Sequence, residues 1–256
     1  MKLHSPFLQS LLYGLGFFSK LTGGIGHFIV RGQASYKILV MQILYTFVEA
    51  LGITAVLSAG IGAAVIIIGM PFLASFSQQQ LIYPLLIMMI TRELGPLLAA
   101  FIVIARSGTA IATEVAGMVV SHEVEAYISI GVDPVEHLGV PRFLGVTISL
   151  FLLNIYFSIF GLAGSFAVAQ LFTPMPAVSY FDNLLKVLSI SDILISIVKS
   201  ISFGMIISAV SLYYGFRVER ASTEIPVAGQ KAVSAALVWY IIVDILLSAL
   251  SYSALV

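Results

Sequence analysis

The sequence contains no cysteine, and only 9% of its 256 residues are charged. Without cysteine, disulfides and thiolate metal sites are excluded. The histidines His4, His27, His122 and His137 lack a ligand spacing such as HExxH, so we expect no metal site. Twelve basic residues balance twelve acidic ones, which argues against a nucleic-acid partner, because such proteins carry a basic excess.

Hydrophobic residues make up 60% of the chain, more than a soluble domain can bury, so lipid must solvate the excess. Five apolar stretches each reach the ~20 residues needed to cross a bilayer. They run over about 38–70, 81–105, 143–172, 190–216 and 232–256. Because backbone groups in lipid must pair internally, the predicted fold is all-α, with five transmembrane helices. We assign residues 37–256 to this five-span domain.

Residues 1–36 are amphipathic rather than uniformly apolar. Ser5 is a good N-cap and Pro6 suits the first helical position. Apolar residues then recur at helical spacing, which predicts an amphipathic helix lying in the membrane interface. The alternative is a short first span, which the five glycines between 14 and 26 disfavour.

The distribution of Lys and Arg predicts the orientation. Segments 1–37, 106–142 and 217–231 hold nine of these residues, whereas the opposite connections hold only Lys186. The positive-inside rule therefore places the N-terminus in the cytoplasm and the C-terminus outside, which requires an odd number of spans.

The connection at about 106–142 is too long for a simple joint. Asp133 would cap a helix with Pro134 at its first position and Glu136 reaching back to the cap. Gly131 would end the preceding helix, and Pro141 would end the second. This segment therefore reads as a cytoplasmic helical hairpin that docks on a motor protein, although a purely connecting role stays open. The candidate coupling residues are Glu114, Glu123, Glu125, Gly131, Asp133, Pro134 and Glu136.

Several motifs are specific. Arg92-Glu93-Leu94-Gly95-Pro96 is followed by a stretch from Ala105 to Glu114 that reads ARSGTAIATE, and then by Gly131-Val132-Asp133-Pro134. Together they resemble the MlaE family of ABC transporter permeases, and the resemblance covers nearly all of the chain from residue 38 on. The family lacks its own ATPase, and no GxxxxGK[ST] phosphate-binding loop occurs in this sequence.

The resemblance implies a multi-pass protein of the bacterial inner membrane that moves phospholipids or related lipids between that membrane and the outer envelope. It implies a homodimer with two ATPase subunits, which hold the ATP and Mg, and a periplasmic MCE-domain protein. In the family the lipid sits between the two permeases.

Five ionisable residues lie in or near the spans, where each costs at least ~2.5–3.5 kcal/mol unless it is paired or hydrated. Arg92, Glu93 and Lys199 are candidates for lining a lipid cavity, and Glu49 and Asp244 for charge pairing. Lys199 with Glu93, or Arg92 with Glu49 or Asp244, are the candidate pairs. A purely structural role for these charges stays open.

Two other functions compete with the lipid permease. An ion-coupled secondary transporter would use the buried charges as a proton relay and would show inverted repeats, which we do not find. A membrane enzyme would need a Ser-His or Asp/His cluster at membrane depth, and the histidines lie elsewhere. We therefore expect a permease without catalytic activity of its own.

Overall fold

A computed structural model describes residues 6–31, 36–172, 176–219 and 221–253, which are helical and contain no strand. Five helical stretches are long and apolar enough to cross a membrane: Tyr36–Ser75, Gln79–Val120, Val135–Leu171, Ile190–Phe216 and Glu224–Ser251. The predicted all-α fold with five spans is therefore confirmed.

The elements follow one another as α1 (Pro6–Arg31), α2 (Tyr36–Thr46), η2 (Val48–Ala50), α3 (Leu51–Ser75), η3 (Gln79–Leu81), α4 (Ile82–Leu86), η4 (Ile87–Leu94), α5 (Gly95–Val103), η5 (Ile104–Gly108), α6 (Thr109–Val120), α7 (Glu123–Ser129), η6 (Val135–Gly139), α8 (Val140–Phe172), α9 (Ala177–Val187), α10 (Ile190–Phe216) and α11 (Glu224–Ser253). The elements η4, η5 and η6 are π-helical, with wider turns than an α-helix. They continue the long helices without a break in the chain direction.

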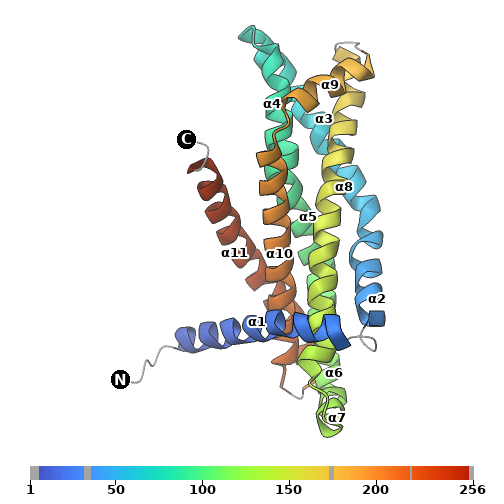
Figure 1. Cartoon of the computed structure of the whole chain (residues 1–256), viewed down its shortest axis with the longest axis vertical. Coiled ribbons are helices and arrows are strands. Elements are labelled where there is room, and N and C mark those ends of the chain that lie inside the picture. Colours follow the sequence, from blue (N-terminus) through green and yellow to red (C-terminus); the bar gives the residue numbers. More distant parts are fainter. Residues whose placement is uncertain (1–5, 32–35, 173–175, 220, 254–256) are drawn as a thin grey trace.

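Helix α8 packs against α3 on one side and α10 on another, and α10 also contacts α11 and α6. Figure 1 shows these helices running nearly side by side, with the α6–α7 hairpin at one end and α9 at the other. We refer to these as the hairpin end and the α9 end.

Small residues let α3 and α8 approach closely. A side chain at Gly62 would overlap the backbone of Gly161, and one at Gly164 would overlap Ala59. In a membrane, such close backbone contact supplies packing energy that the hydrophobic effect does not.

Helix α1 lies crosswise to the bundle at the hairpin end (Figure 1). Leu21 is fully buried, and the Phe18 ring packs edge-on against Phe143 of α8. Gly24 leaves room for Val140, which a Cβ would contact at 2.8 Å. The interfacial placement of this helix stays a prediction, and its expected N-cap, Ser5, lies outside the described residues.

The predicted limits of the hairpin are wrong at both ends. The second span does not end near Ala105, because its helix continues to Val120. The third span begins at Val135, and Pro141 lies inside it rather than ending a short helix. The π-helical turn η6 ends at Gly139, two residues before Pro141, and a wider turn accommodates a residue that has no N–H to donate. The connection between the two long helices is therefore residues 121–134, with α7 inside it.

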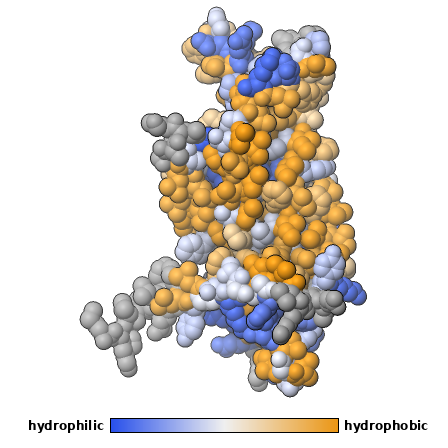
Figure 2. All heavy atoms as spheres, viewed as in Figure 1, coloured by the Kyte–Doolittle hydropathy of each residue, from blue (hydrophilic) through white to orange (hydrophobic). Residues whose placement is uncertain are grey.

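The surface divides into zones along the bundle. Figure 2 shows hydrophobic residues covering the middle of the visible face, and hydrophilic residues gathered towards both ends. Beyond the hydrophilic zone at the hairpin end lies a second, small hydrophobic patch (Figure 2). Ile128 and Ile130, at the end of α7, are 59% and 72% exposed.

Candidate functional site: a charge cluster between three membrane helices

Lys199 of α10 is fully buried among polar groups from two other spans. Its Nζ lies 2.5 Å from Glu93 Oε2 and 3.0 Å from Asp244 Oδ1, and it donates to Ser248 Oγ at 2.7 Å. Ser248 Oγ in turn donates to Glu93 Oε2 at 3.2 Å. The predicted pairing of Lys199 with Glu93 is confirmed, and Asp244 joins the same cation.

Arg92 is also buried, with only 6% of its side chain exposed. Its Nη2 donates to Ser251 Oγ at 2.9 Å, and its Nη1 lies 3.7 Å from Asp192 Oδ1. Its Nε lies 3.6 Å from Glu93 Oε1, so the neighbouring residues on the helix approach each other without a short contact. Among the ion pairs of the described residues, the two carboxylates predicted as alternatives for Arg92 lie against other cations, Glu49 against Arg106 and Asp244 against Lys199.

Asp192 is a member of this cluster that the sequence reasoning missed. It sits in the first turn of α10, where Ser189 Oγ accepts from the Asp192 N–H and the Asp192 carboxylate accepts from the Ser189 N–H. Ser-x-x-Asp before an apolar run is a capping-box pattern, so the sequence did signal that this carboxylate faces back along the helix. Its second contact, with Arg92, depends on the packing of span two.

The π-helical stretch η4 carries both Arg92 and Glu93. It ends at Leu94. At the next residue, Gly95, a Cβ would meet Ile90 O at 2.7 Å and Asn154 Oδ1 at 2.8 Å. Pro96 follows and cannot donate a backbone hydrogen bond. π-helical turns occur often at functional sites, and this one presents both charges to α10 and α11.

The cluster holds two cations and three carboxylates: Arg92, Lys199, Glu93, Asp192 and Asp244. Burying charges is tolerated only when partners and hydrogen bonds replace water. Chemically, the cations can bind a phosphate, and the carboxylates can bind an amine or hold the cations in place.

Glu49 lies apart from this cluster. Arg106 of η5 donates to the Glu49 backbone carbonyl and reaches its Oε2 at 2.9 Å. Glu49 belongs to η2, where the first span departs from α-helical geometry, so Arg106 joins the irregular turn of span one to the π-helical turn of span two. The side chain of Glu49 is 51% exposed and that of Arg106 is 39% exposed.

Asp133 caps a helix, as predicted, but this helix is the start of the third span rather than a separate short helix of the hairpin. Its Oδ1 accepts from the backbone N–H of Val135 at 2.9 Å and of Glu136 at 3.4 Å. Its Oδ2 lies 2.5 Å from Lys20 Nζ on α1. Partial burial acts to raise the pKa of this carboxyl, but Lys20 and the two N–H groups outweigh it and hold the pKa below its usual value.

Gly131 ends the preceding helix, as predicted. Gly131 has φ +78°, and the hydrogen bonds from Gly131 N to Ile128 O and from Val132 N to Tyr127 O end α7 in a Schellman motif. Glu136 does not reach back to the cap as expected, since its Oε1 lies 3.7 Å from His27 Nδ1 on α1.

The remaining coupling candidates divide into two groups. Glu114 lies 2.7 Å from Nη2 of the buried Arg142, which ties the second long helix to the third. Glu123 accepts from Ser121 Oγ at 3.1 Å, and Glu125 lies 2.9 Å from His122 Nδ1. Only the second group lies at the end of the hairpin.

Comparison with known proteins gives a consistent result. The family model described as "Permease MlaE" matches residues 39–250. The chain is 28% identical over 188 residues to a probable ABC transporter permease protein of Rickettsia typhi, covering 73% of each chain. It is 26% identical over 220 residues to the intermembrane phospholipid transport system permease protein MlaE of Haemophilus influenzae, covering 86% of this chain and 84% of that protein. It is also 27% identical over 223 residues to the chloroplastic protein TRIGALACTOSYLDIACYLGLYCEROL 1 of Arabidopsis thaliana, covering 86% and 63%.

Proposed function

The chain belongs to the MlaE permease family, and on that premise we propose that it is the membrane subunit of an ATP-driven transporter of phospholipids or related lipids. Relatives carry names of ABC transporter permeases, and one is named for intermembrane phospholipid transport. The protein is a multi-pass membrane permease, not an enzyme. In the proposed role it moves lipid between the inner membrane and the outer envelope.

The observation that carries the proposal is the buried charge cluster around Lys199. An apolar bundle has no need of two cations and three carboxylates for stability alone, because each charge at membrane depth is costly. Charged residues inside spans commonly mark a substrate pathway. We propose that Arg92 and Lys199 receive the phosphate of a lipid headgroup and that Glu93 positions them.

The hairpin end supports coupling to a separate ATPase. Ile128 and Ile130, at the end of α7, are exposed, and α7 lies at the far tip of the hairpin end (Figure 1), where neither the bundle nor a bilayer centred on it would cover them. Isolated exposed isoleucines of this kind suit insertion into an apolar groove of a partner. Asp133, Pro134 and Gly131 fix the hairpin geometry, so force applied to α7 reaches the third span directly.

The proposed assembly contains two copies of this chain, two ATPase subunits that hold ATP and Mg, and a periplasmic MCE-domain protein. The first and fifth spans support a second copy, since only 22% and 11% of their most apolar windows are buried within one chain. The N-terminus is proposed to be cytoplasmic and the C-terminus periplasmic, following the nine-to-one distribution of basic residues.

Native mass spectrometry of the complex purified through this chain tests the assembly, because it reports subunit stoichiometry and bound lipid together. Co-purification of an ATPase and an MCE-domain protein is expected. A lone protein that catalyses flux driven by a pH gradient would instead establish the ion-coupled transporter.

Single substitutions test the role of the cluster. Arg92→Ala, Glu93→Ala and Lys199→Ala are each expected to reduce ATP-driven lipid transfer between donor and acceptor vesicles by about tenfold or more. Lys186→Ala is the matched control, because Lys186 is an exposed lysine of α9 that lies one helical turn from its partner Asp182. If assembly and transfer survive all three cluster substitutions, the proposed lipid site is wrong.

A further inference from the structure

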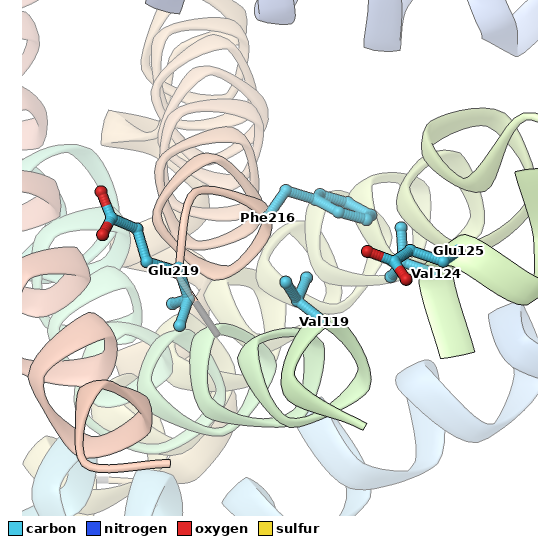
Figure 3. Close-up of a pocket in the computed structure, with 6 residues that line it drawn as sticks. Val119, Val124, Glu125, Phe216 and Glu219 are labelled. Carbon is cyan, nitrogen blue, oxygen red and sulfur yellow. The ribbon is translucent and has the colours of Figure 1, made fainter. Parts of the chain in front are cut away.

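A pocket of about 510 Å³ opens at the hairpin end, and its walls contain no member of the charge cluster. It is lined by Val119, Val124, Glu125, Phe216, Val218 and Glu219. Figure 3 shows Val119 and Phe216 directed towards each other. The charge cluster, in contrast, lies where three spans pack together, so contacts between helices must set the positions of its charges.

One chain of hydrogen bonds reaches the cluster from α8. Asn154 of α8 donates from Nδ2 to Ser196 Oγ at 2.8 Å and to the Ser196 carbonyl at 3.3 Å. Ser196 Oγ, on α10, donates in turn to the carbonyl oxygen of Thr91 at 2.8 Å. The side chains of all three residues are buried. Thr91 directly precedes Arg92, so the chain of hydrogen bonds ends on the backbone that carries the first cation of the cluster.

The carbonyl of Thr91 needs a donor from outside its own helix. In an α-helix it would accept from the N–H of Gly95, four residues on, but this N–H bonds to Ile90 O in the π-helical pattern. In a π-helix the carbonyl would accept from residue 96, and Pro96 has no N–H. Ser196 Oγ therefore supplies the hydrogen bond that η4 itself cannot, and this stabilises the π-helical form.

Ser196 also lies between two members of the cluster on one face of α10. Asp192 comes four residues before it and Lys199 three residues after it, spacings that place side chains on the same side of a helix. The three side chains together contact residues 91–93 of η4. The hydrogen bond of Ser196 thus fixes η4 against α10 between the two ion-pair contacts.

Asn154 supplies an amide that packing alone does not require. The Ser196 carbonyl can only accept, so the NH₂ group of Asn154 must face it. Within the part of the chain that the structure describes, Asn154 Oδ1 has no hydrogen-bond partner, and a Cβ at Gly95 would contact this oxygen at 2.8 Å. An unsatisfied buried oxygen costs more than an apolar side chain of the same shape. The hydrogen bonds to Ser196 therefore explain the asparagine better than its packing does.

We propose that Asn154 and Ser196 are positioning residues for the lipid headgroup, an inference that rests on the proposed function. They hold η4 in its π-helical form, and that form sets the direction in which Arg92 and Glu93 leave the helix. They act through these two charges, without contacting the lipid themselves.

Loss of the Ser196 hydroxyl has a defined structural consequence. Without it, the Thr91 carbonyl gains a donor only if the Gly95 N–H returns to it, as in an α-helix. A shift of one residue corresponds to a rotation of about 100° around the helix axis. The two charges of η4 would then turn relative to Lys199, and the cations would no longer face one phosphate together.

The kinetics of lipid transfer distinguish positioning from a general loss of stability. The probe is a fluorescent phosphatidylglycerol whose mole fraction in the donor vesicles is varied, and transfer is measured with the intact complex and ATP. Ser196→Ala is expected to raise the apparent KM for this lipid about tenfold and to leave the maximal rate within about twofold. A lower maximal rate at an unchanged KM would show a loss of active protein and would overturn the proposal.

Two further variants serve as comparisons. Ser200→Ala is the matched control, because Ser200 is a fully buried serine of α10 whose Oγ donates to Ile197 O within its own helix. Its KM is expected to equal that of the unmodified chain, and a rise as large as that of Ser196→Ala would contradict the proposal. Asn154→Leu removes the donor to Ser196 but leaves Ser196 Oγ able to donate to Thr91, so KM should rise by less.

A double-mutant cycle tests whether Ser196 acts through Arg92. If it does, adding Ser196→Ala to Arg92→Ala raises the KM only slightly further, because the charge that Ser196 positions is already absent. An additive rise would refute the proposal. If Arg92→Ala alone leaves transfer unchanged, the proposed lipid site fails; if it reduces transfer while Ser196→Ala leaves the KM unchanged, only this inference fails.

Discussion

The Nζ of Lys199 lies 2.5 Å from Oε2 of Glu93, and the lysine is fully buried between α10, η4 and α11. Removing one member of a buried ion pair leaves the other charge without compensation, which typically costs about 3–5 kcal/mol. Lys199→Ala is therefore expected to lower the unfolding temperature strongly, followed in detergent by the fluorescence of Trp239, the only tryptophan.

The triple variant Lys199→Ala, Glu93→Gln, Asp244→Asn provides the control. It removes the same cation together with the two carboxylates that face it, so it is expected to be more stable than Lys199→Ala alone. A triple variant that is no more stable would show that packing, rather than charge balance, sets the stability of the cluster.

The contact between α3 and α8 predicts a contrast between two glycines one half-turn apart. Gly62→Ala is expected to lower stability by about 1–3 kcal/mol or more, because the added methyl group would overlap the Gly161 backbone. Gly60→Ala is the control, since nothing lies within 4 Å of its added Cβ, and it should be neutral or slightly stabilising. Unfolding of both variants in SDS titrations distinguishes them.

Gly131 predicts a backbone effect at the hairpin. At φ +78°, an alanine is strained, whereas asparagine tolerates this region better. Gly131→Ala is therefore expected to destabilise the hairpin by about 1–2 kcal/mol, and Gly131→Asn by less. Hydrogen exchange of the α7 amides reports the difference, and equal exchange in both variants would contradict it.

The ion pair of Lys20 with Asp133 predicts a pH-dependent contact between α1 and the hairpin. Because the folded state lowers the pKa of Asp133, its contribution is present at neutral pH and is lost as the pH falls through that pKa, below about pH 4. Spin labels at Ser19→Cys and Ser129→Cys should give a narrow distance distribution at pH 7 that broadens only in acid.

Lys20→Met serves as the comparison in that experiment. Without the lysine, α1 loses its ionic tie to the N-cap, and the distribution is expected to be broader already at pH 7. A distribution that is unchanged by both acid and this substitution would mean that Leu21 and the aromatic contacts alone hold α1 in place.

The spans could be predicted from hydropathy, because an apolar stretch of about 20 residues forms a transmembrane helix in lipid. Their ends could not. Arg106 and Glu114 read as loop residues in the sequence, yet both lie on a helix that continues to Val120, and each is neutralised by a partner distant in sequence, Glu49 or Arg142. Polar character marks the end of a span only where such partners are missing.

The charge cluster was predicted in part for a similar reason. The rarity of charge inside spans identified Arg92, Glu93 and Lys199, and simple pairing anticipated the contact of Lys199 with Glu93. The partner of Arg92 depends on the direction in which its side chain leaves the helix. The π-helical stretch η4 changes that direction, and no periodicity in the sequence reveals where a π-helical stretch occurs. Asp192 was overlooked because it stands at the start of a span and serves first as a helix cap.

The three π-helical turns also have a consequence for insertions and deletions. A π-helical turn holds about one residue more than an α-helical turn, and one residue corresponds to a rotation of about 100° around the helix axis. Deleting a single residue within η5 would return that turn to α-helical geometry. The helices before and after it, α5 and α6, would keep their rotation about the helix axis. The deletion would therefore be absorbed within η5, at the expense of the Arg106 contact. Elsewhere in these spans, a one-residue deletion has no such place to be absorbed and would turn one end of the helix away from its neighbours.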